Sequence, residues 1–265
     1  MMEAVILAAG RGSRLGTLTD ERPKCMIELA GAPLIGLQIA ALRASNVTAL
    51  SIVGGYAADQ LRGLDVPVIL NPRWDETNMV ESLLCARDAL AADGPLIVSY
   101  GDIVFEPRLA TDLIAAPGDI ATVIDLDWLN LWRARSDNPL ADAESLRIDG
   151  DGRITDIGHR VRTISEIEGQ YIGLTKFSAA GKRTLLDFVA RAGTNDWPYE
   201  KPLDEIHFTD LLSGIIAQGT EVRAVPVHSG WLEVDTPQDL AVYESLLADR
   251  SLGQFYALPD GCGQW

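Results

Sequence analysis

Cysteine is scarce in this chain, which holds only Cys25, Cys85 and Cys262 among its 265 residues. Cysteines so few and so scattered supply neither a disulfide framework nor a zinc site. Long apolar runs are also lacking, since the N-terminal apolar stretch, residues 4–9, has only the length of a strand. No basic-then-apolar leader is present either. The cytoplasm is therefore the expected location.

Positive charge is in short supply as well. The chain has 22 lysines and arginines against 38 aspartates and glutamates, a formal net charge of −16. This excess argues against a nucleic acid or an anionic membrane as the main partner, although it allows phosphate binding at one local site. We therefore expect small-molecule partners, no nucleic acid and no membrane, and a homo-oligomer stays open.

The composition is otherwise that of an ordinary globular protein, with 47% hydrophobic and 23% charged residues. Through about residue 105, buried strands are predicted at 4–9, 49–53, 66–70 and 95–99, and helices at 33–44 and 79–90. This alternation of strand and helix predicts an α/β fold with a doubly wound, mostly parallel, Rossmann-like sheet.

After residue 105 the pattern loosens. We expect strands at 120–126, 171–177 and 222–227, a hairpin at 146–157, and helices at 182–191, 208–218 and 236–249. No internal repeat or linker interrupts the chain. The prediction is a single domain over residues 1–265, with a small inserted lobe at roughly 125–205. This lobe is the expected binding site of a second substrate, called the acceptor below.

A glycine-rich segment, residues 7–16 (LAAGRGSRLG), leaves the first predicted strand and is followed by Arg22-Pro-Lys24. Small residues let backbone N–H groups approach a phosphate chain, and Arg14 and Lys24 can neutralise its charge. The spacing fits neither the Rossmann fingerprint nor the P-loop. Taken alone, such a turn is as often purely structural, and Arg11 alone can be a solvated loop charge.

Two aspartates are candidate metal ligands. Asp102 follows a predicted buried strand directly, so its carboxylate should point into the crevice at the strand ends. Mg²⁺ needs only one or two carboxylates besides phosphate oxygens and water. Asp235, in the segment GWLEVDTP, is the second candidate. Taken singly, a Gly-Asp pair is usually a turn, and Asp235 would be a helix N-cap.

Together these motifs resemble the signature of the sugar-phosphate nucleotidyltransferase superfamily. Residues 77–82 (TNMVES) resemble its cytidylyltransferase branch, which acts on phosphocholine, aminoethylphosphonate or phospho-amino-acid acceptors. Residues 168–177 and 227–235 strengthen this likeness, which spans most of the chain. The polar residues Thr77 and Asn78 can also be simple helix caps.

The resemblance implies a set of site residues. For the nucleotide it implies Leu7, Ala8, Ala9, Gly10, Arg11, Gly12, Ser13, Arg14, Lys24, Thr77, Asn78, Ser82 and Asp102. Catalysis would depend on Arg14, Lys24, Asp102 and Asp235, and the two aspartates would hold Mg²⁺ on the triphosphate.

Candidates for the acceptor lie in the predicted lobe. Trp128 and Trp132 are four residues apart, so on a helix they share a face that can bind an amine by cation–π contact or form the core of the lobe. Arg133, Lys176 and Glu168 are further candidates, and the resemblance places a basic residue near the strand that contains Lys176.

The predicted function is a Mg²⁺-dependent cytidylyltransferase. CTP and a small phosphorylated or phosphonylated acceptor, bearing an amine or amino acid, would give a CDP- or CMP-linked product and pyrophosphate. The acceptor oxygen is already anionic, so placement and charge neutralisation should suffice. Two alternatives remain: a sugar-1-phosphate nucleotidyltransferase that uses UTP or dTTP, and a nucleotide-sensing domain without catalysis.

Overall fold

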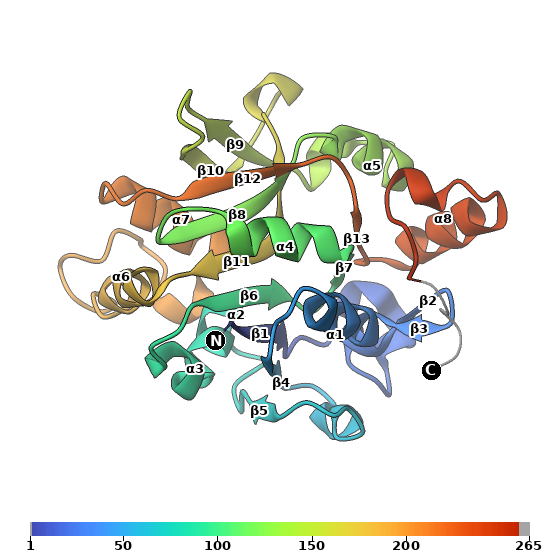
Figure 1. Ribbon diagram of the computed structural model, residues 1–265, viewed down its shortest axis with the longest axis horizontal. Coiled ribbons are helices and arrows are strands. Elements are labelled where there is room, and N and C mark those ends of the chain that lie inside the picture. The colour runs from blue at the N-terminus through green and yellow to red at the C-terminus, as the bar shows by residue number, and fades with distance from the viewer. Residues whose placement is uncertain (1, 260–265) are drawn as a thin grey trace.

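The computed structural model describes residues 2–259, and a seven-stranded sheet forms its centre (Figure 1). The strand order is β12-β8-β11-β6-β1-β4-β5. The strands are β1 (Glu3–Ala8), β4 (Ala49–Gly54), β5 (Val68–Leu70), β6 (Leu96–Tyr100), β8 (Ile120–Asp125), β11 (Gln170–Phe177) and β12 (Arg223–Val227).

The sheet is mostly parallel, as the sequence predicts. Strands β6, β1, β4 and β5 pair in parallel, and β12 is parallel to β8. Only β11 runs antiparallel to both of its neighbours, β6 and β8. The predicted fold class is therefore confirmed. Cys262, one of the three cysteines named above, lies outside the described residues.

Helices cover both faces of the sheet. They are α1 (Leu34–Ala44), α2 (Met79–Cys85), α3 (Arg87–Ala91), α4 (Pro107–Ala115), α5 (Trp128–Arg135), α6 (Ala179–Val189), α7 (Phe208–Ala217) and α8 (Pro237–Ala248). Short 3₁₀ turns occur at Ser13–Thr19, Lys24–Met26, Ala58–Leu61, Pro139–Ala141, Ile164–Glu166, Leu203–Glu205 and Leu252–Gln254. No helix among residues 2–259 is both long and apolar enough to cross a membrane.

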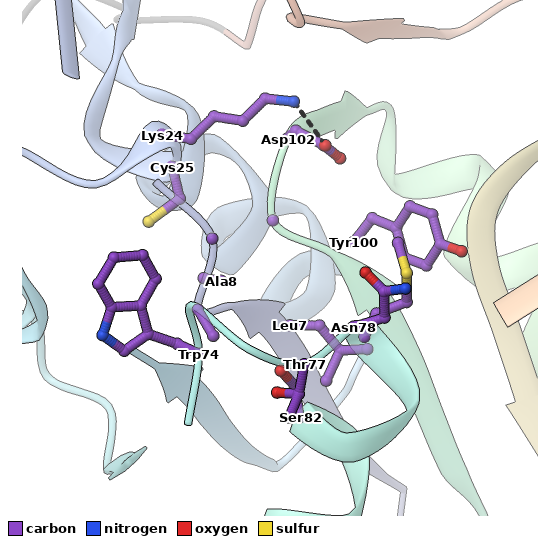
Figure 2. A pocket seen from close by; sticks show the side chains of 14 residues that line it. Leu7, Ala8, Lys24, Cys25, Trp74, Thr77, Asn78, Ser82, Tyr100 and Asp102 are labelled. Carbon is purple, nitrogen blue, oxygen red and sulfur yellow. Dashed lines mark hydrogen bonds and ion pairs between the residues drawn. The ribbon is translucent and has the colours of Figure 1, made fainter. Parts of the chain in front are cut away.

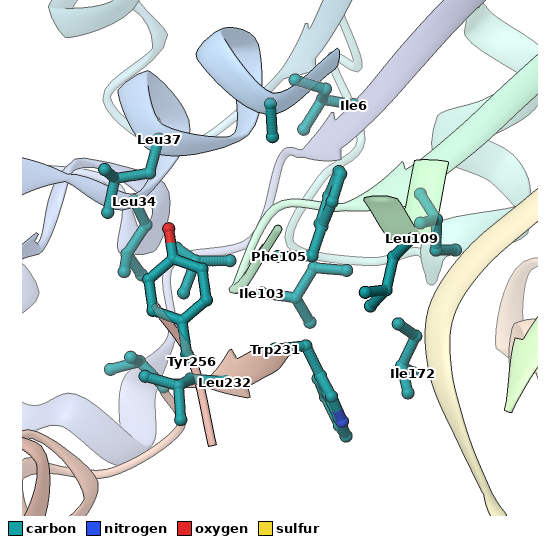
Figure 3. Packing of buried hydrophobic residues seen from close by; sticks show 14 of the residues in the cluster. Ile6, Leu34, Leu37, Ile103, Phe105, Leu109, Ile172, Trp231, Leu232 and Tyr256 are labelled. Atoms are coloured by element: carbon teal, nitrogen blue, oxygen red, sulfur yellow. The ribbon is translucent and has the colours of Figure 1, made fainter. Parts of the chain in front are cut away.

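Alternating residues of β1 face two separate apolar cores. Ala4 and Ile6 belong to the core under α1 and α4, whereas Val5 and Leu7 belong to the core under α2, α3, α6 and α7. In Figure 3, Ile6 lies near Phe105 in the first of these cores, which extends to Trp231 and Tyr256. Burial on both faces explains why β1 is continuously apolar.

Three two-stranded ladders lie outside the main sheet. They are the hairpin β9 (Glu144–Ile148) with β10 (Ile154–Arg160), the pair β7 (Ile103–Phe105) with β13 (Trp231–Glu233), and the pair β2 (Glu28–Leu29) with β3 (Ala32–Pro33). In the second pair Ile103 lies opposite Glu233. This antiparallel pairing brings two segments that are about 130 residues apart in the sequence to the same place, beside the end of β6.

Most predicted element ends shift by a few residues, and one predicted element differs more. The helix predicted at 79–90 is two helices, because Ala86 leaves the helical region with φ −82° and ψ 53°. Within the lobe predicted at 125–205, β11 and α6 belong to the layers of the main sheet. Helix α5 and the β9–β10 hairpin form the part outside it.

Candidate active site

The glycine-rich loop places Lys24 at the carboxyl end of β1. Gly12 has a left-handed backbone conformation with φ +73°, and a Cβ there would lie 2.9 Å from carbons of the Lys24 side chain. Glycine therefore both permits the turn and leaves room for the lysine to cross the loop. Lys24 itself begins the next 3₁₀ turn, directly after Pro23.

The predicted catalytic residues converge here. Lys24 Nζ lies 2.7 Å from Asp102 Oδ2 and also pairs with the Asp235 carboxylate, and Arg14 Nη2 lies 2.9 Å from Asp235 Oδ1. Burial by itself would lower the pKa of Lys24, but the carboxylates of Asp102 and Asp235 outweigh it, so this pKa is raised. The ammonium thus stays charged between the two aspartates.

Glu233 adds a third carboxylate that the sequence analysis missed. Oxygen atoms of Asp102, Glu233 and Asp235 lie within 4.8 Å of one another. Burial and the charge of Asp235 raise the pKa of Glu233, and the nearby Arg135 opposes this shift. Its position two residues before Asp235 is the signal that could have found it, because alternate residues of an extended segment share a face.

This acidic group fits a hard divalent cation. The Asp102 Oδ1 atom is buried and has no hydrogen-bond partner within the described part of the chain. Lys24 pairs with the other oxygen of this carboxylate, so Oδ1 stays available as a ligand, beside two further carboxylates, for a metal ion. Oxygen ligands of this kind are those that Mg²⁺ prefers.

Asp235 is available because another residue caps the helix that follows it. Thr236 is the N-cap of α8 and forms a capping box with Asp239. The Asp239 carboxylate also accepts the backbone N–H of Asp235 at 2.9 Å and pairs with Arg135 Nε at 2.9 Å. The alternative that Asp235 is an N-cap is therefore wrong, and Arg135 is a second residue that the sequence analysis did not place here.

A cavity of about 180 Å³ opens beside Lys24 (Figure 2). Of the residues predicted to bind the nucleotide, it is lined by Leu7, Ala8, Ala9, Gly10, Lys24, Thr77, Asn78, Ser82 and Asp102. Trp74 and Tyr100 lie on opposite sides of it in Figure 2, and neither was predicted. Three predicted nucleotide-binding residues line neither this cavity nor the second cavity described below: Arg11, Gly12 and Ser13. The Arg11 side chain instead pairs with Asp20 at 2.9 Å.

The end of β6 forms one wall of this first cavity. A Cβ on Gly101 would lie 2.7 Å from the carbonyl oxygen of Leu7 and 2.9 Å from Ala8. Only glycine lets β6 leave the sheet so close to β1. This close approach sets the position of Asp102, the next residue.

Hydroxyl groups on the opposite wall are held in place by Asn71. Its Nδ2 donates to Thr77 Oγ1 at 3.0 Å and to Ser82 Oγ at 3.1 Å. The Thr77 hydroxyl donates in turn to the carbonyl of Arg73, at 2.8 Å. Asn78 occupies the N-cap position of α2, but its side chain donates to the Glu205 carbonyl instead of capping the helix.

A second cavity, of about 260 Å³, adjoins the first and shares Met79, Tyr100 and Asp102 with it. Its other lining residues are Arg14, Trp132, Asp142, Glu144, Gln170, Tyr171, His207, Thr209, Glu233 and Asp235. Asp102 therefore lies where the two cavities meet.

The tryptophans predicted for the acceptor differ in their positions. Both are buried, Trp128 with 3% and Trp132 with 5% of its surface exposed, and their ring centroids are 5.9 Å apart. Trp132 also packs against Trp231 and lines the second cavity. Trp128 does not line that cavity, so it is a core residue, the alternative raised for this pair. Of the two tryptophans, only Trp132 can contact a ligand in the second cavity.

The other acceptor candidates lie elsewhere. Arg133 is exposed on α5, and Lys176 Nζ donates to the carbonyls of Ile114, at 3.2 Å, and Ala116, at the end of α4. Glu168 accepts the backbone N–H of Ile148 at 2.6 Å. None of the three lines either cavity. Lys176 is held by carbonyls at the end of α4, Glu168 is held by the β9 backbone, and Arg133 points to solvent.

The mostly parallel sheet, the glycine-rich loop at the end of β1 and the carboxylates at the neighbouring strand ends define the class: this is a nucleotidyltransferase fold. Residues 4–153 match the family model described as the MobA-like NTP transferase domain, and the chain belongs to that family.

Individual relatives agree with this. The chain is 36% identical over 250 residues to CTP:phosphoglutamine cytidylyltransferase of Campylobacter jejuni, covering 91% of this chain and 98% of the relative. It is 26% identical to 2-aminoethylphosphonate cytidylyltransferase of Lancefieldella rimae, covering 91% of each. The solved inositol-1-phosphate CTP transferase from T. maritima shares the fold, with a TM-score of 0.70, 20% identity, and coverage of 97% of this chain and 98% of that one.

Proposed function

We propose that this nucleotidyltransferase transfers the CMP group of CTP to a small phosphorylated or phosphonylated acceptor that bears an amine, and releases pyrophosphate. The observation that carries the proposal is the convergence of Lys24, Asp102 and Asp235 where the two cavities meet. Relatives named as cytidylyltransferases of phosphoglutamine and of 2-aminoethylphosphonate support both the nucleotide and the kind of acceptor.

The first cavity is the proposed nucleotide site. Its floor is the end of β1, where small residues expose backbone N–H groups to a phosphate chain. Ser82 Oγ accepts a hydrogen bond from Asn71, so its own proton is available to a ligand. The O2 and N3 atoms of cytosine are acceptors, and this proton suits them. Uracil and thymine share the O2 acceptor, so the choice of CTP is supported by the relatives named above and not by this wall.

Asp102, Glu233 and Asp235 would hold Mg²⁺. Such an ion supplies positive charge against the triphosphate and against the charge that develops on the leaving pyrophosphate. Lys24 reaches the mouth of the first cavity and can donate to an oxygen of the α-phosphate. Arg14 lines the second cavity, where it can donate to the acceptor's phosphate or phosphonate.

The chemistry is then an in-line displacement. An anionic oxygen of the acceptor attacks the α-phosphorus, the new P–O bond forms, and the bond to the β-phosphate oxygen breaks with release of pyrophosphate. No general base is required because the attacking oxygen carries no proton. The predicted lobe contributes Trp132 from α5 and Glu144 from β9 to the acceptor cavity.

The test is pyrophosphate release with CTP, UTP, dTTP and ATP, each with 2-aminoethylphosphonate, O-phosphoethanolamine, phosphocholine and glucose-1-phosphate. We expect turnover with CTP and an amine-bearing acceptor, dependent on Mg²⁺. A higher kcat/KM with glucose-1-phosphate and UTP or dTTP would establish the sugar nucleotidyltransferase alternative instead. Nucleotide binding without turnover in any combination would indicate the sensing domain.

A further inference from the structure

The second cavity is lined by hydrogen-bond acceptors, a carboxylate and an amide oxygen, that an anionic phosphate would not need. Glu144 begins β9 and Gln170 begins β11, and both line this cavity. The two strands are tied together nearby, because the N–H of Glu168 donates to the carbonyl of Leu146 at 2.9 Å. Hairpin and sheet therefore hold the two side chains at one wall.

Gln170 contributes a buried acceptor without a donor. The residue is 6% exposed, and its Oε1 atom has no hydrogen-bond partner among residues 2–259. Leaving a buried carbonyl oxygen unpaired is unfavourable, because it has lost its hydrogen bonds to water. A ligand that donates a hydrogen bond inside this cavity would remove that cost.

Glu144 adds negative charge beside it. It forms no ion pair within the portion of the chain that the structure covers, while the exposed Asp142 lies near the same wall. Burial raises the pKa of Glu144, and a hydrogen bond with Thr209 and the nearby His207 oppose this shift. A cationic donor would favour the ionised carboxylate and would be attracted by it.

Aromatic rings complete the surroundings. Tyr100 and Tyr171 both line the cavity, with ring centroids 5.7 Å apart in an edge-to-face arrangement, and Trp132 lines it too. Ring faces attract alkylammonium groups, but they offer no hydrogen-bond acceptor to a particular N–H group. Only acceptors such as the Gln170 amide oxygen and the Glu144 carboxylate can favour an ammonium that has N–H groups over one that has none.

We propose that Glu144 and Gln170 form the subsite for the acceptor's amine, and that it selects a primary ammonium over a quaternary one. This inference rests on the proposed function and makes its acceptor more specific. A primary ammonium has three N–H donors, enough for Glu144 and Gln170 Oε1 together, whereas a trimethylammonium group has none. The phosphate or phosphonate at the opposite end of the acceptor then meets Arg14, which lines the same cavity.

The experiment compares three acceptors that differ only at this end: O-phosphoethanolamine, phosphocholine, and propyl phosphate, in which a methyl group replaces the ammonium. With CTP and Mg²⁺ in excess, we expect kcat/KM for O-phosphoethanolamine to exceed that of the other two by about tenfold or more. Glu144→Gln should lower this value about tenfold, mainly through KM, and leave propyl phosphate nearly unchanged. Gln170→Met should remove the preference for the primary over the quaternary amine.

Matched controls are Glu200→Gln and Gln60→Met, which change exposed residues outside both cavities. The KM for CTP and the melting temperature should stay constant in all four variants. The proposal is overturned if phosphocholine is the better substrate, or if Glu144→Gln affects all three acceptors equally.

Failure of the proposed function can be recognised separately. If the wild-type protein releases no pyrophosphate from CTP with any acceptor, calorimetric titration with O-phosphoethanolamine still tests the subsite. Weaker binding to Glu144→Gln than to the wild type and Glu200→Gln would support the amine subsite. Equal binding to all three proteins, or binding to none, would overturn it.

Discussion

Arg135 Nε lies 2.9 Å from Asp239 Oδ1 and joins α5 to the first turn of α8. The same guanidinium donates through Nη1 to Glu233 at 2.8 Å. Because the Asp239 carboxylate also accepts the backbone N–H of Asp235, Arg135 holds the segment that presents two of the three clustered carboxylates. In Figure 1, α5 and α8 lie side by side at this edge of the fold.

We predict that Arg135→Met destabilises the protein by about 3–5 kcal/mol, because it leaves the buried Asp239 and the partly buried Glu233 without this cation. The Arg135 side chain is only 7% exposed, so solvent cannot replace it. Denaturant unfolding measures this change. If Arg135 positions the metal ligands, the variant should also need more Mg²⁺ for half-maximal activity.

Arg133→Met, two residues earlier on the exposed side of α5, is the matched control and should change neither quantity. Arg135→Lys should recover part of the stability lost in Arg135→Met. It restores the positive charge, but an ammonium cannot donate to Asp239 and Glu233 with the planar fork of the guanidinium. An Arg135→Met variant with normal stability and normal Mg²⁺ dependence would contradict the positioning role.

Asp102→Asn and Asp235→Asn should each reduce kcat about a thousandfold, because each removes one charged ligand from the triphosphate's metal. The side chains keep their size, so the melting temperature should not fall by more than a few degrees. Asp112→Asn, on the exposed side of α4, serves as the control. Near-normal kcat at ordinary Mg²⁺ concentration in either variant would show that this carboxylate does not hold the ion.

Lys24→Ala should lower kcat more than it raises the KM for CTP. The ammonium is held by Asp102 and Asp235, where charge shifts toward the leaving pyrophosphate during the reaction. Steady-state kinetics with varied CTP separate the two effects, and Arg62→Ala is an exposed control. A raised KM with kcat intact would make Lys24 a ground-state contact only.

Gly101→Ala should destabilise the protein by about 1–3 kcal/mol and raise the KM for CTP. Its Cβ would lie 2.7 Å from a backbone oxygen of Leu7, so the wall of the nucleotide cavity must shift. Gly63→Ala is the matched control, because a Cβ there meets nothing within 4 Å. Thermal melting and CTP titration should distinguish the two variants, and equal behaviour would contradict the steric argument.

The glycine-rich loop could be predicted from local pattern, whereas the pairing of Asp102 with Asp235 was implied only by the resemblance to a known family. A buried parallel strand that ends in small residues places them where the carboxyl ends of the strands meet, as β1 does. The break at Ala86 and the ladder between β7 and β13 could not be predicted, since each follows from packing between distant segments. That Arg133, Lys176 and Glu168 lie outside both cavities also became visible only in the tertiary structure.

The sequence by itself determined the α/β class, the glycine-rich loop after the first strand, and, through the family resemblance, Lys24, Asp102 and Asp235 as candidate site residues. Hydrophobic periodicity and glycine placement act within one or two elements, so they can be recognised along the chain. Only the tertiary structure decided that Glu233 joins the aspartates and that Glu144 and Gln170 share one cavity wall. Those relationships depend on strand order and on contacts between residues far apart in sequence, which no local pattern encodes.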